Sequence, residues 1–269
     1  MGAAMLLVVD VGNTQTHFGV YRDGEDVVAE HWRFATVRES TRDELGAALA
    51  NLLGLRGLGF TDIDRSIVSS TVPQLSEEWL RMAARYLDHE MLVVGPALRT
   101  GMPIRYDNPR EVGADRLANA IAAYDRVRDT CVVVDFGTAI TYDVVSAAGE
   151  YLGGIITPGA EISIDALYER AAKLPKVELA QPRALIGKST VEAIRSGIVY
   201  GFAGQVDGIV HRLRDELGAH TKVIATGGLA GALVPAVQET IDEVDDLLTL
   251  TGLRLIWERN APEGPSAGG

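Results

Sequence analysis

The sequence predicts an α/β fold of two similar half-domains, each with a mixed β-sheet flanked by helices. An apolar run that ends in Asp-x-Gly occurs near residue 10 and again near residue 135. The first half of the chain is predicted as strand–strand–strand–helix–strand–helix–strand, the order expected for a mixed sheet with helices on it. The chain has 269 residues, of which 47% are hydrophobic and 23% charged, enough for two modest domains with a sizeable core.

The first motif lies in the segment LLVVDVGNTQTHFGVY at Leu6–Tyr21. Its apolar run ends at Asp10, a turn follows at 12–14, and Phe18–Tyr21 is again rich in β-forming residues. This pattern is typical of an antiparallel hairpin, and taken alone it is most often no more than that. However, Gly12 would let backbone N–H groups approach a large anion, and a carboxylate beside them suits hydrated Mg²⁺. The turn therefore has the parts of a triphosphate site.

The segment CVVVDFGT at Cys131–Thr138 repeats this motif. At one fixed offset Asp10 corresponds to Asp135, Gly12 to Gly137, Gly24 to Gly149 and Glu25 to Glu150. Internal repetition predicts two half-domains that face each other, each offering an Asp-Gly turn to one cleft. We expect the half-domains at 1–128 and 129–260, and a disordered tail at 261–269, which is rich in Gly, Pro and Ser.

Hydrophobic spacing predicts the other elements of the first half. Strands are expected at 27–34, 65–72 and 91–94, and helices at 41–53, 74–87 and 111–128. Thr41-x-x-Glu44 is a capping box for the first of these helices. The loop 95–109 ends in polar and aromatic residues around Tyr106, which is either a half-buried loop aromatic or a ligand contact. Asp115 in the last helix either stabilises the helix dipole or acts as a base, with Arg116 beside it to orient an anionic substrate.

In the second half, strands are expected at 131–135, 140–145, 151–156 and 222–226, and helices at 160–172, 191–217 and from 229. Ser189 and Glu192 form a second capping-box pattern, in which the hydroxyls of Ser189 and Thr190 cap the long helix and remain able to contact a ligand. Gly227-Gly228 separates a strand from a helix, a corner at which a base or ribose could lie against bare backbone. Apolar segments at 247–250 and 253–258 complete the fold.

Composition narrows the classes of partner. A formal net charge of −12 disfavours nonspecific nucleic-acid binding, but it leaves room for a basic pocket that binds a small anion. Cys131 is the only cysteine and lies in an apolar strand, which favours a buried inert thiol over a nucleophile. No apolar run approaches the ~20 residues that span a bilayer, and the first residues lack the basic start of a signal peptide. We therefore expect a cytoplasmic protein with neither a nucleic-acid nor a membrane partner.

These motifs resemble those of the acetate and sugar kinase/Hsp70/actin superfamily and, within it, type III pantothenate kinases. The matching segments are DVGNT at Asp10–Thr14, GADR at Gly113–Arg116, DFGTA at Asp135–Ala139, GGIITPG at Gly153–Gly159, IGKSTVEAIRSG at Ile186–Gly197 and LTLTGLRLIWERN at Leu248–Asn260. The resemblance covers about residues 5–260. It implies actin-like (ribonuclease H-like) half-domains.

The resemblance also implies an activity, namely phosphorylation of the primary hydroxyl of pantothenate by ATP with Mg²⁺, the first step of coenzyme A synthesis. The implied ATP contacts are Asp10, Val11, Gly12, Asn13, Thr14, Gln15, Thr16, His17 and Thr138, with Asp10 also near Mg²⁺. The implied pantothenate contacts are Tyr106, Gly113, Ala114, Asp115, Arg116 and Thr190, with Asp115 as proton acceptor. Asp135 would hold a monovalent cation, K⁺ or NH₄⁺. The family forms homodimers that bind pantothenate near the subunit interface, so a homodimer is implied here.

Two residues depart from the family pattern, since Gln15 and His17 stand where relatives often have Asn and a small apolar residue. The chain also lacks the GxxxxGK[ST] loop of P-loop kinases, which excludes the type I pantothenate kinases. Two alternatives stay open, another small-molecule kinase of the same superfamily and a nucleotide-binding regulatory protein without enzymatic activity. The presence of all three aspartates, Asp10, Asp115 and Asp135, favours an enzyme.

Overall fold

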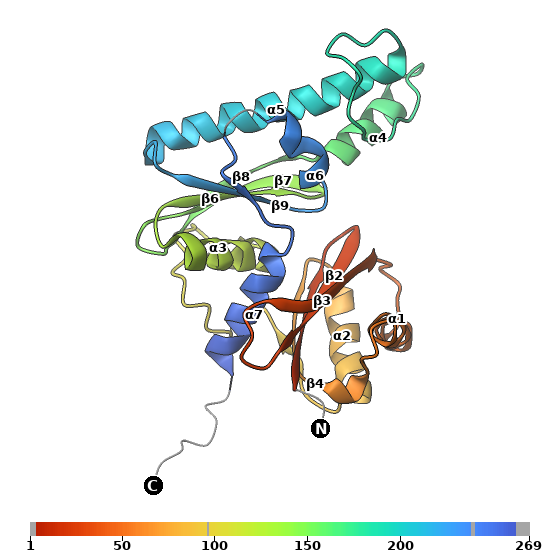
Figure 1. Cartoon of the computed structure of the whole chain (residues 1–269), viewed down its shortest axis with the longest axis vertical. Coiled ribbons are helices and arrows are strands. Elements are labelled where there is room, and N and C mark those ends of the chain that lie inside the picture. Colours follow the sequence, from red (N-terminus) through yellow and green to blue (C-terminus); the bar gives the residue numbers. More distant parts are fainter. Residues whose placement is uncertain (1–3, 96, 238–239, 262–269) are drawn as a thin grey trace. The chain divides into compact units, whose positions relative to one another are not determined.

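The computed structural model describes residues 4–95, 97–237 and 240–261, so the tail predicted at 261–269 lies outside the description from residue 262 onward. The chain forms two compact units (Figure 1). Unit 1 comprises the described residues within Met1–Met102, Asn108–Ala122 and Leu248–Gly269, and unit 2 those within Pro103–Asp107 and Ala123–Leu247. The sequence placed 248–260 with the second half, whereas the structure places it in unit 1.

Unit 1 contains a mixed five-stranded sheet in the order β3-β2-β1-β4-β5. Its strands are β1 (Met5–Val11), β2 (Gln15–Arg22), β3 (Val28–Ala35), β4 (Ile63–Ser70) and β5 (Leu92–Val93). Its helical segments are α1 (Arg42–Gly54), η1 (Phe60–Asp62), α2 (Pro73–Tyr86), η2 (Pro109–Glu111), the first part of α3 (Ala114–Val127) and α7 (Leu248–Asn260). β1 pairs antiparallel with β2 and parallel with β4, so the first hairpin lies at the centre of the sheet.

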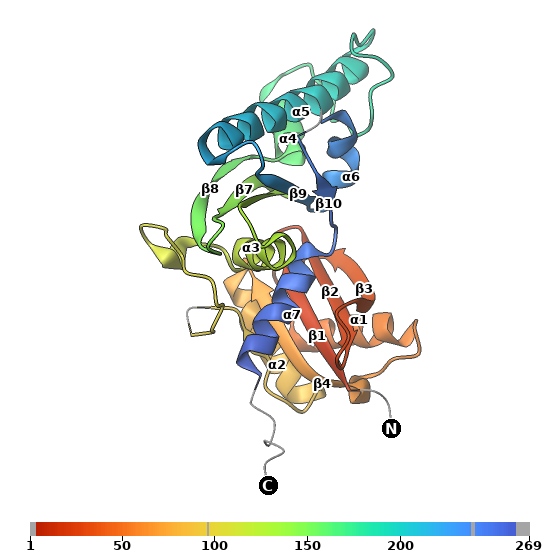
Figure 2. The same ribbon diagram turned by 60° about the vertical axis from the view of Figure 1, so that its left-hand side comes forward.

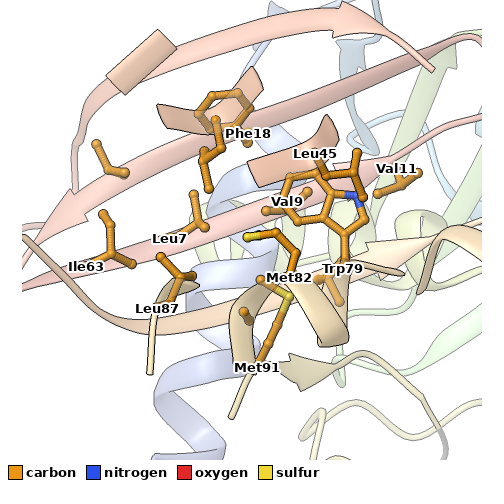
Figure 3. Packing of buried hydrophobic residues seen from close by; sticks show 14 of the residues in the cluster. Leu7, Val9, Val11, Phe18, Leu45, Ile63, Trp79, Met82, Leu87 and Met91 are labelled. Carbon is orange, nitrogen blue, oxygen red and sulfur yellow. The ribbon is translucent and has the colours of Figure 1, made fainter. Parts of the chain in front are cut away.

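Alternation along β1 separates the two faces of this sheet. Leu7 and Val9 join the core with Phe18 of β2 and with Trp79 and Met82 of α2 (Figure 3). Helix α1 contributes buried leucines to the same cluster, and the predicted capping box at its start forms in full. Burial of these apolar side chains is the main term that stabilises the unit, because each Å² of apolar surface removed from water contributes about 25 cal/mol.

Helix α7 covers the other face of the sheet, where it contacts β1 and β4 (Figure 2). Its Leu250 reaches Gly19 of β2, a residue that pairs with Val8 of β1. The backbone at Gly252 lies directly against the carbonyl of Ala118 in α3. These contacts explain why the last helix belongs to unit 1. The two apolar segments expected at 247–250 and 253–258 belong to this one helix.

Unit 2 contains a second five-stranded sheet, in the order β10-β9-β6-β7-β8. Its strands are β6 (Cys131–Phe136), β7 (Ala139–Val145), β8 (Tyr151–Pro158), β9 (Lys222–Thr226) and β10 (Glu243–Val244). Its helical segments are the end of α3, α4 (Ala160–Arg170), the long α5 (Thr190–Leu217), α6 (Ala230–Leu233) and η3 (Val234–Ala236). Side chains from β6, β7, β9, α4, α5 and α6 form its core.

The two sheets share one topology, which confirms the predicted fold class and the internal repeat. In each, the strand that carries the motif aspartate pairs antiparallel with the next strand and parallel with a strand from later in the unit. Gly24 and Gly149 occupy equivalent turns with φ of +72° and +77°, a conformation that favours glycine. The turns after the aspartates differ by one residue, since Val11 pairs with Thr16 but Phe136 pairs with Ile140.

Among the described helices, none combines the length and the apolar character needed to cross a membrane.

Candidate active site

The β1–β2 turn follows Asp10 and is tightly constrained. The amide of Gly12 donates to the carbonyl of Gln15 at 3.0 Å, and the amide of Thr36 donates to the carbonyl of Thr14 at 2.9 Å. A Cβ on Gly12 would lie 2.9 Å from that Gln15 oxygen, so this position requires glycine. The side chains at 13–15 are exposed. The turn is therefore fixed on its inner side and open to a ligand on its outer side.

The last two residues of the predicted phosphate segment, Thr16 and His17, lie within β2 and are buried. The hydroxyl of Thr16 is 2.9 Å from that of Thr36, and Nε2 of His17 is 3.2 Å from Nδ1 of His31. Burial, together with the nearby charge of Arg33 and with His31, lowers the pKa of His17 to about 3. These two side chains connect β2 to β3 and to the residue that follows it. The lowered pKa keeps His17 neutral at physiological pH.

Arg38 is a residue beside this turn that the sequence did not indicate. Its Nη2 donates to Oδ1 of Asn13 at 3.3 Å, and its side chain is exposed. The segment after β3 returns to the turn because Thr36 is bonded to Thr14, a contact that hydrophobic spacing does not reveal. Arg38 also lines a pocket of about 480 Å³ beside the starts of α1 and α2. The arrangement places a cation beside amides that could receive a phosphate.

Asp115 lies in the first turn of α3, as predicted, although the helix begins at Ala114 rather than Glu111. The residues before it form the short helix η2. Oδ1 of Asp115 accepts a hydrogen bond from the amide of Arg116 at 2.8 Å, and Arg116 itself is buried. Burial raises the pKa of Asp115, while the amide and the charge of Arg116 lower it by less. A carboxylate with a raised pKa is a better proton acceptor than an exposed one.

Asp135 is the last residue but one of β6 in unit 2, the position that Asp10 has on β1. Gly227, with φ of +97°, packs so closely that a Cβ there would overlap Oδ1 of Asp135. In the following turn the amide of Gly137 donates to the carbonyl of Ala139 at 3.1 Å. Thr138 at its tip is exposed. The Gly-Gly corner predicted to face a base thus places its first glycine against a carboxylate.

Tyr106 is half-buried in unit 2, close to β8. Its ring centroid is 6.3 Å from that of Tyr151, and a Cβ on Gly153 would lie 3.7 Å from its ring. Gly153 has φ of +135°, a backbone conformation that favours glycine. These contacts fix the ring of Tyr106 on β8 within the GGIITPG segment.

Thr190 is the first residue of α5 and is exposed. Ser189 caps the helix by accepting from the amide of Glu192 at 3.3 Å. The carboxylate of Glu192 does not return to Ser189, because it accepts from the amide of Arg183 and from Arg195, both at 3.1 Å. Only the Ser189 half of the predicted capping box therefore forms. The carboxylate of Glu192, which would complete the box, instead ties the loop before α5 to the helix.

A pocket of about 740 Å³ lies beside Leu229, the residue after the Gly-Gly corner. Apolar side chains, Ile164 and Leu179 among them, line it together with charged residues of α4 and of the loop that follows. It is large enough for a small organic ligand. Cys131, by contrast, is fully buried as expected, and burial raises the pKa of its thiol to about 12, which disfavours the reactive thiolate.

The described residues contain no group of three or more His, Cys, Asp or Glu side chains that could hold a metal ion. Mg²⁺ needs no such group, since it keeps several waters and binds one or two carboxylates together with the phosphates of a substrate. Asp10 is a single carboxylate directly before the exposed β1–β2 turn.

Comparison with known proteins identifies the family of the chain. A model of the family described as type III pantothenate kinase matches residues 6–212. The type III pantothenate kinase of Moorella thermoacetica is 50% identical over 256 residues, covering 95% of this chain and 100% of the relative. That of Acidothermus cellulolyticus is 52% identical over 262 residues, covering 96% and 100%.

A solved structure, that of the ethanolamine utilization protein EutJ from Carboxydothermus hydrogenoformans, matches with a TM-score of 0.58 at 16% identity. The match covers 94% of this chain and 89% of that one, and it bears on the fold alone. The sequence relatives match over their whole length and at about half of all positions. On this basis, the chain belongs to the type III pantothenate kinase family.

Proposed function

We propose that this protein transfers the γ-phosphoryl group of ATP to the primary hydroxyl of pantothenate, giving 4′-phosphopantothenate. The observation that carries the proposal is identity of about half of all residues, over the whole length of relatives named type III pantothenate kinase. The site geometry supports it, because a glycine turn open to an anion and a carboxylate with raised pKa occur in one compact unit.

In unit 1 the backbone amides at 13–14 and the guanidinium of Arg38 receive the phosphates of ATP, while the amide of Gly12 stays bonded to the carbonyl of Gln15. Phosphoryl transfer proceeds through a loose transition state that spreads charge over the equatorial oxygens, so donors held in place supply most of the catalysis. Asp10 holds hydrated Mg²⁺, which when bound neutralises phosphate charge. Arg38 strengthens this site because it is held at Asn13 before any ligand arrives.

Asp115 accepts the proton of the pantothenate hydroxyl as that oxygen attacks phosphorus. Burial raises its pKa and so makes it more basic, while the bond from the Arg116 amide fixes its orientation. Arg116 and the backbone at 113–114 contact the pantothenate carboxylate or amide. A positioned base of this kind contributes roughly 10²–10⁴-fold to the rate.

In unit 2 we assign K⁺ or NH₄⁺ to Asp135, an ATP contact to Thr138, and pantothenate contacts to Tyr106 and Thr190. Asp135 supplies a carboxylate for this cation near the end of β6, where the backbone of Gly227 lies against it. We place the nucleoside in the pocket beside Leu229, which is large enough for a small organic ligand.

We further propose that the protein works as a homodimer. Exposed large apolar side chains gather on β8, α4 and the region that begins α5, all within unit 2, and exposed apolar surface of this kind marks an interface. They are Leu152, Ile155, Ile156, Ile162, Leu167, Tyr168, Leu185, Ile186 and Tyr200. Thr190 lies in the same region, so a pantothenate contact near a subunit interface is consistent with this surface.

The proposal is tested by measuring ADP release from Mg·ATP with pantothenate and with a panel of other hydroxy acids and sugars, in K⁺ and in Na⁺ buffer. We expect release only with pantothenate, and a faster rate in K⁺. Asp135→Ala should abolish the difference between the two salts. Release with a sugar instead would favour the alternative kinase, and no release with any acceptor would favour a nucleotide-binding regulator.

A further inference from the structure

Ser69 is a fully buried residue near the carboxyl end of β4. Among the residues that the structure describes, its Oγ has no hydrogen-bond partner. A buried hydroxyl left in this state costs about 1–3 kcal/mol, and folded proteins rarely retain one without a reason. Ser69 therefore calls for a partner that the polypeptide does not supply.

The neighbouring hydroxyls on the same segment do have partners. Oγ of Ser66 is 2.7 Å from Nε2 of His89. Ser70 donates to the carbonyl of Val72 at 2.8 Å, and Thr71 donates to the carbonyl of Val11 at 3.1 Å. Ser69 is thus an exception on a strand whose other hydroxyls are bonded, so general loose packing of β4 does not explain it.

The register of the sheet places Ser69 beside Asp10. The two residues are direct partners of the parallel pair β1–β4, so their side chains leave the same face of the sheet at neighbouring positions. Both lie at the carboxyl ends of parallel strands, which is where α/β sheets bind their ligands. The glycine turn that we assign to the phosphates of ATP follows directly from β1.

Unit 2 repeats this arrangement. Thr226 of β9 is buried and is the direct parallel partner of Asp135 on β6. Each half of the molecule therefore places one buried hydroxyl residue beside the aspartate near the end of its central strand. Two strands of different units carry the same pairing, so a hydroxyl beside the aspartate is a repeated feature of the fold.

We propose that Ser69 is a positioning residue that, with Asp10, holds a water molecule of Mg²⁺ when the metal and nucleotide are bound. The inference rests on the proposed function, since it deepens the assignment of Mg²⁺ to Asp10. Mg²⁺ keeps several of its waters in such sites, and each bound water donates its hydrogens to acceptors around the metal. A serine hydroxyl can both accept from such a water and donate to a phosphate oxygen or a carboxylate. Residues behind the direct metal ligands typically change metal affinity 10–100-fold.

The first test measures metal binding rather than turnover. Mn²⁺ replaces Mg²⁺ as a paramagnetic probe, and its free concentration is followed by electron paramagnetic resonance in the presence of the whole protein and ADP. Ser69→Ala should weaken Mn²⁺ binding about tenfold. Ser66→Ala is the matched control, because it removes another buried hydroxyl from the same strand, one bonded to His89, and should leave Mn²⁺ affinity unchanged.

The second test is the melting temperature without metal or nucleotide. Ser69→Ala removes a hydroxyl that has no partner in the polypeptide, so the melting temperature should stay the same or rise. Ser66→Ala removes a bonded hydroxyl and should lower it. Loss of Mn²⁺ affinity without loss of melting temperature in Ser69→Ala supports the assignment.

Two outcomes would overturn the assignment. Unchanged Mn²⁺ affinity in Ser69→Ala would show that the hydroxyl does not serve the metal, and a fall in melting temperature like that of Ser66→Ala would make its role structural. If the parent protein phosphorylates pantothenate in either case, only the role of Ser69 fails. If the parent protein with ADP binds no Mn²⁺, the nucleotide site of the proposed function fails as well.

Discussion

A side chain on residue 113 would collide with the carboxylate of Asp115, since a Cβ built on Gly113 lies 2.5 Å from Oδ1. The glycine thus leaves space for the orientation that the Arg116 amide holds through its bond to the same oxygen, at 2.8 Å. The GADR segment therefore works as one unit, in which the first residue makes room for the third.

Gly113→Ala should displace the carboxylate without unfolding the protein. A displacement of about 1 Å at a reacting group can cost about 10²-fold in rate, so we expect kcat to fall by that order while the KM for ATP stays near the parent value. Asp115→Asn should lose roughly 10²–10⁴-fold. Steady-state kinetics with a melting curve for each variant measures both. Near-normal turnover in Asp115→Asn would remove this residue from the role of base.

Arg38→Ala should raise the KM for ATP about tenfold and change the KM for pantothenate little. The guanidinium is exposed, so its contribution is at the lower end for a charged hydrogen bond. Arg81→Ala is the matched control, because Arg81 is an exposed arginine of unit 1 that pairs with Glu77 and Glu78 on its own helix. Equal KM values for ATP in the two variants would exclude Arg38 from the phosphate site.

His17 should make the fold sensitive to acid. Its pKa is lowered to about 3 in the folded state, from 6.5 as the ordinary value, so between these pH values the unfolded chain binds more protons. The stabilisation is complete above about pH 6.5 and falls by up to about 1.4 kcal/mol per pH unit as the pH drops toward 3.

Urea unfolding of the parent and of His17→Gln, at several pH values between 4 and 8, checks this prediction. The variant should show a shallower pH dependence than the parent. His211→Gln, which changes an exposed histidine of α5, should keep the slope of the parent. An unchanged slope in His17→Gln would contradict the assignment.

Gly252→Ala should destabilise unit 1, because the added methyl group would overlap the carbonyl oxygen of Ala118 where α7 meets α3. Forced packing of this kind typically costs about 1–3 kcal/mol. Gly54→Ala, at the end of α1, has nothing within 4 Å of its added methyl group and should be neutral or slightly stabilising. Chemical denaturation of the two variants measures the difference, and equal stabilities would contradict the packing described here.

The sequence predicted the repeated hairpins well, because apolar alternation and Asp-x-Gly turns are local signals. The fold class followed from them, and the internal repeat appears in the equivalent turns at Gly24 and Gly149. The assignment of α7 to unit 1 could not be predicted from the sequence, because it depends on a contact between Gly252 and Ala118, two residues that are far apart in the chain.

The residues of the candidate site likewise divide into those that local motifs reveal and those that only the folded chain brings together. Asp10, Asp115 and Asp135 stand in motifs that a sequence displays directly. Arg38 does not, because its place beside Asn13 depends on the bond between Thr36 and Thr14. Ser69 was equally invisible, since its significance lies in the parallel register with Asp10 and in the absence of a partner for its hydroxyl among the described residues.

The most direct test of the central claim is the identity of the product. The protein is incubated with Mg·ATP and pantothenate in K⁺ buffer, and the acceptor is examined by mass spectrometry and phosphorus NMR. We predict one phosphoryl group on the primary hydroxyl of pantothenate, formed in a one-to-one ratio with ADP and roughly 10²–10⁴-fold more slowly with Asp115→Asn. Recovery of unmodified pantothenate with the folded parent protein would contradict the account.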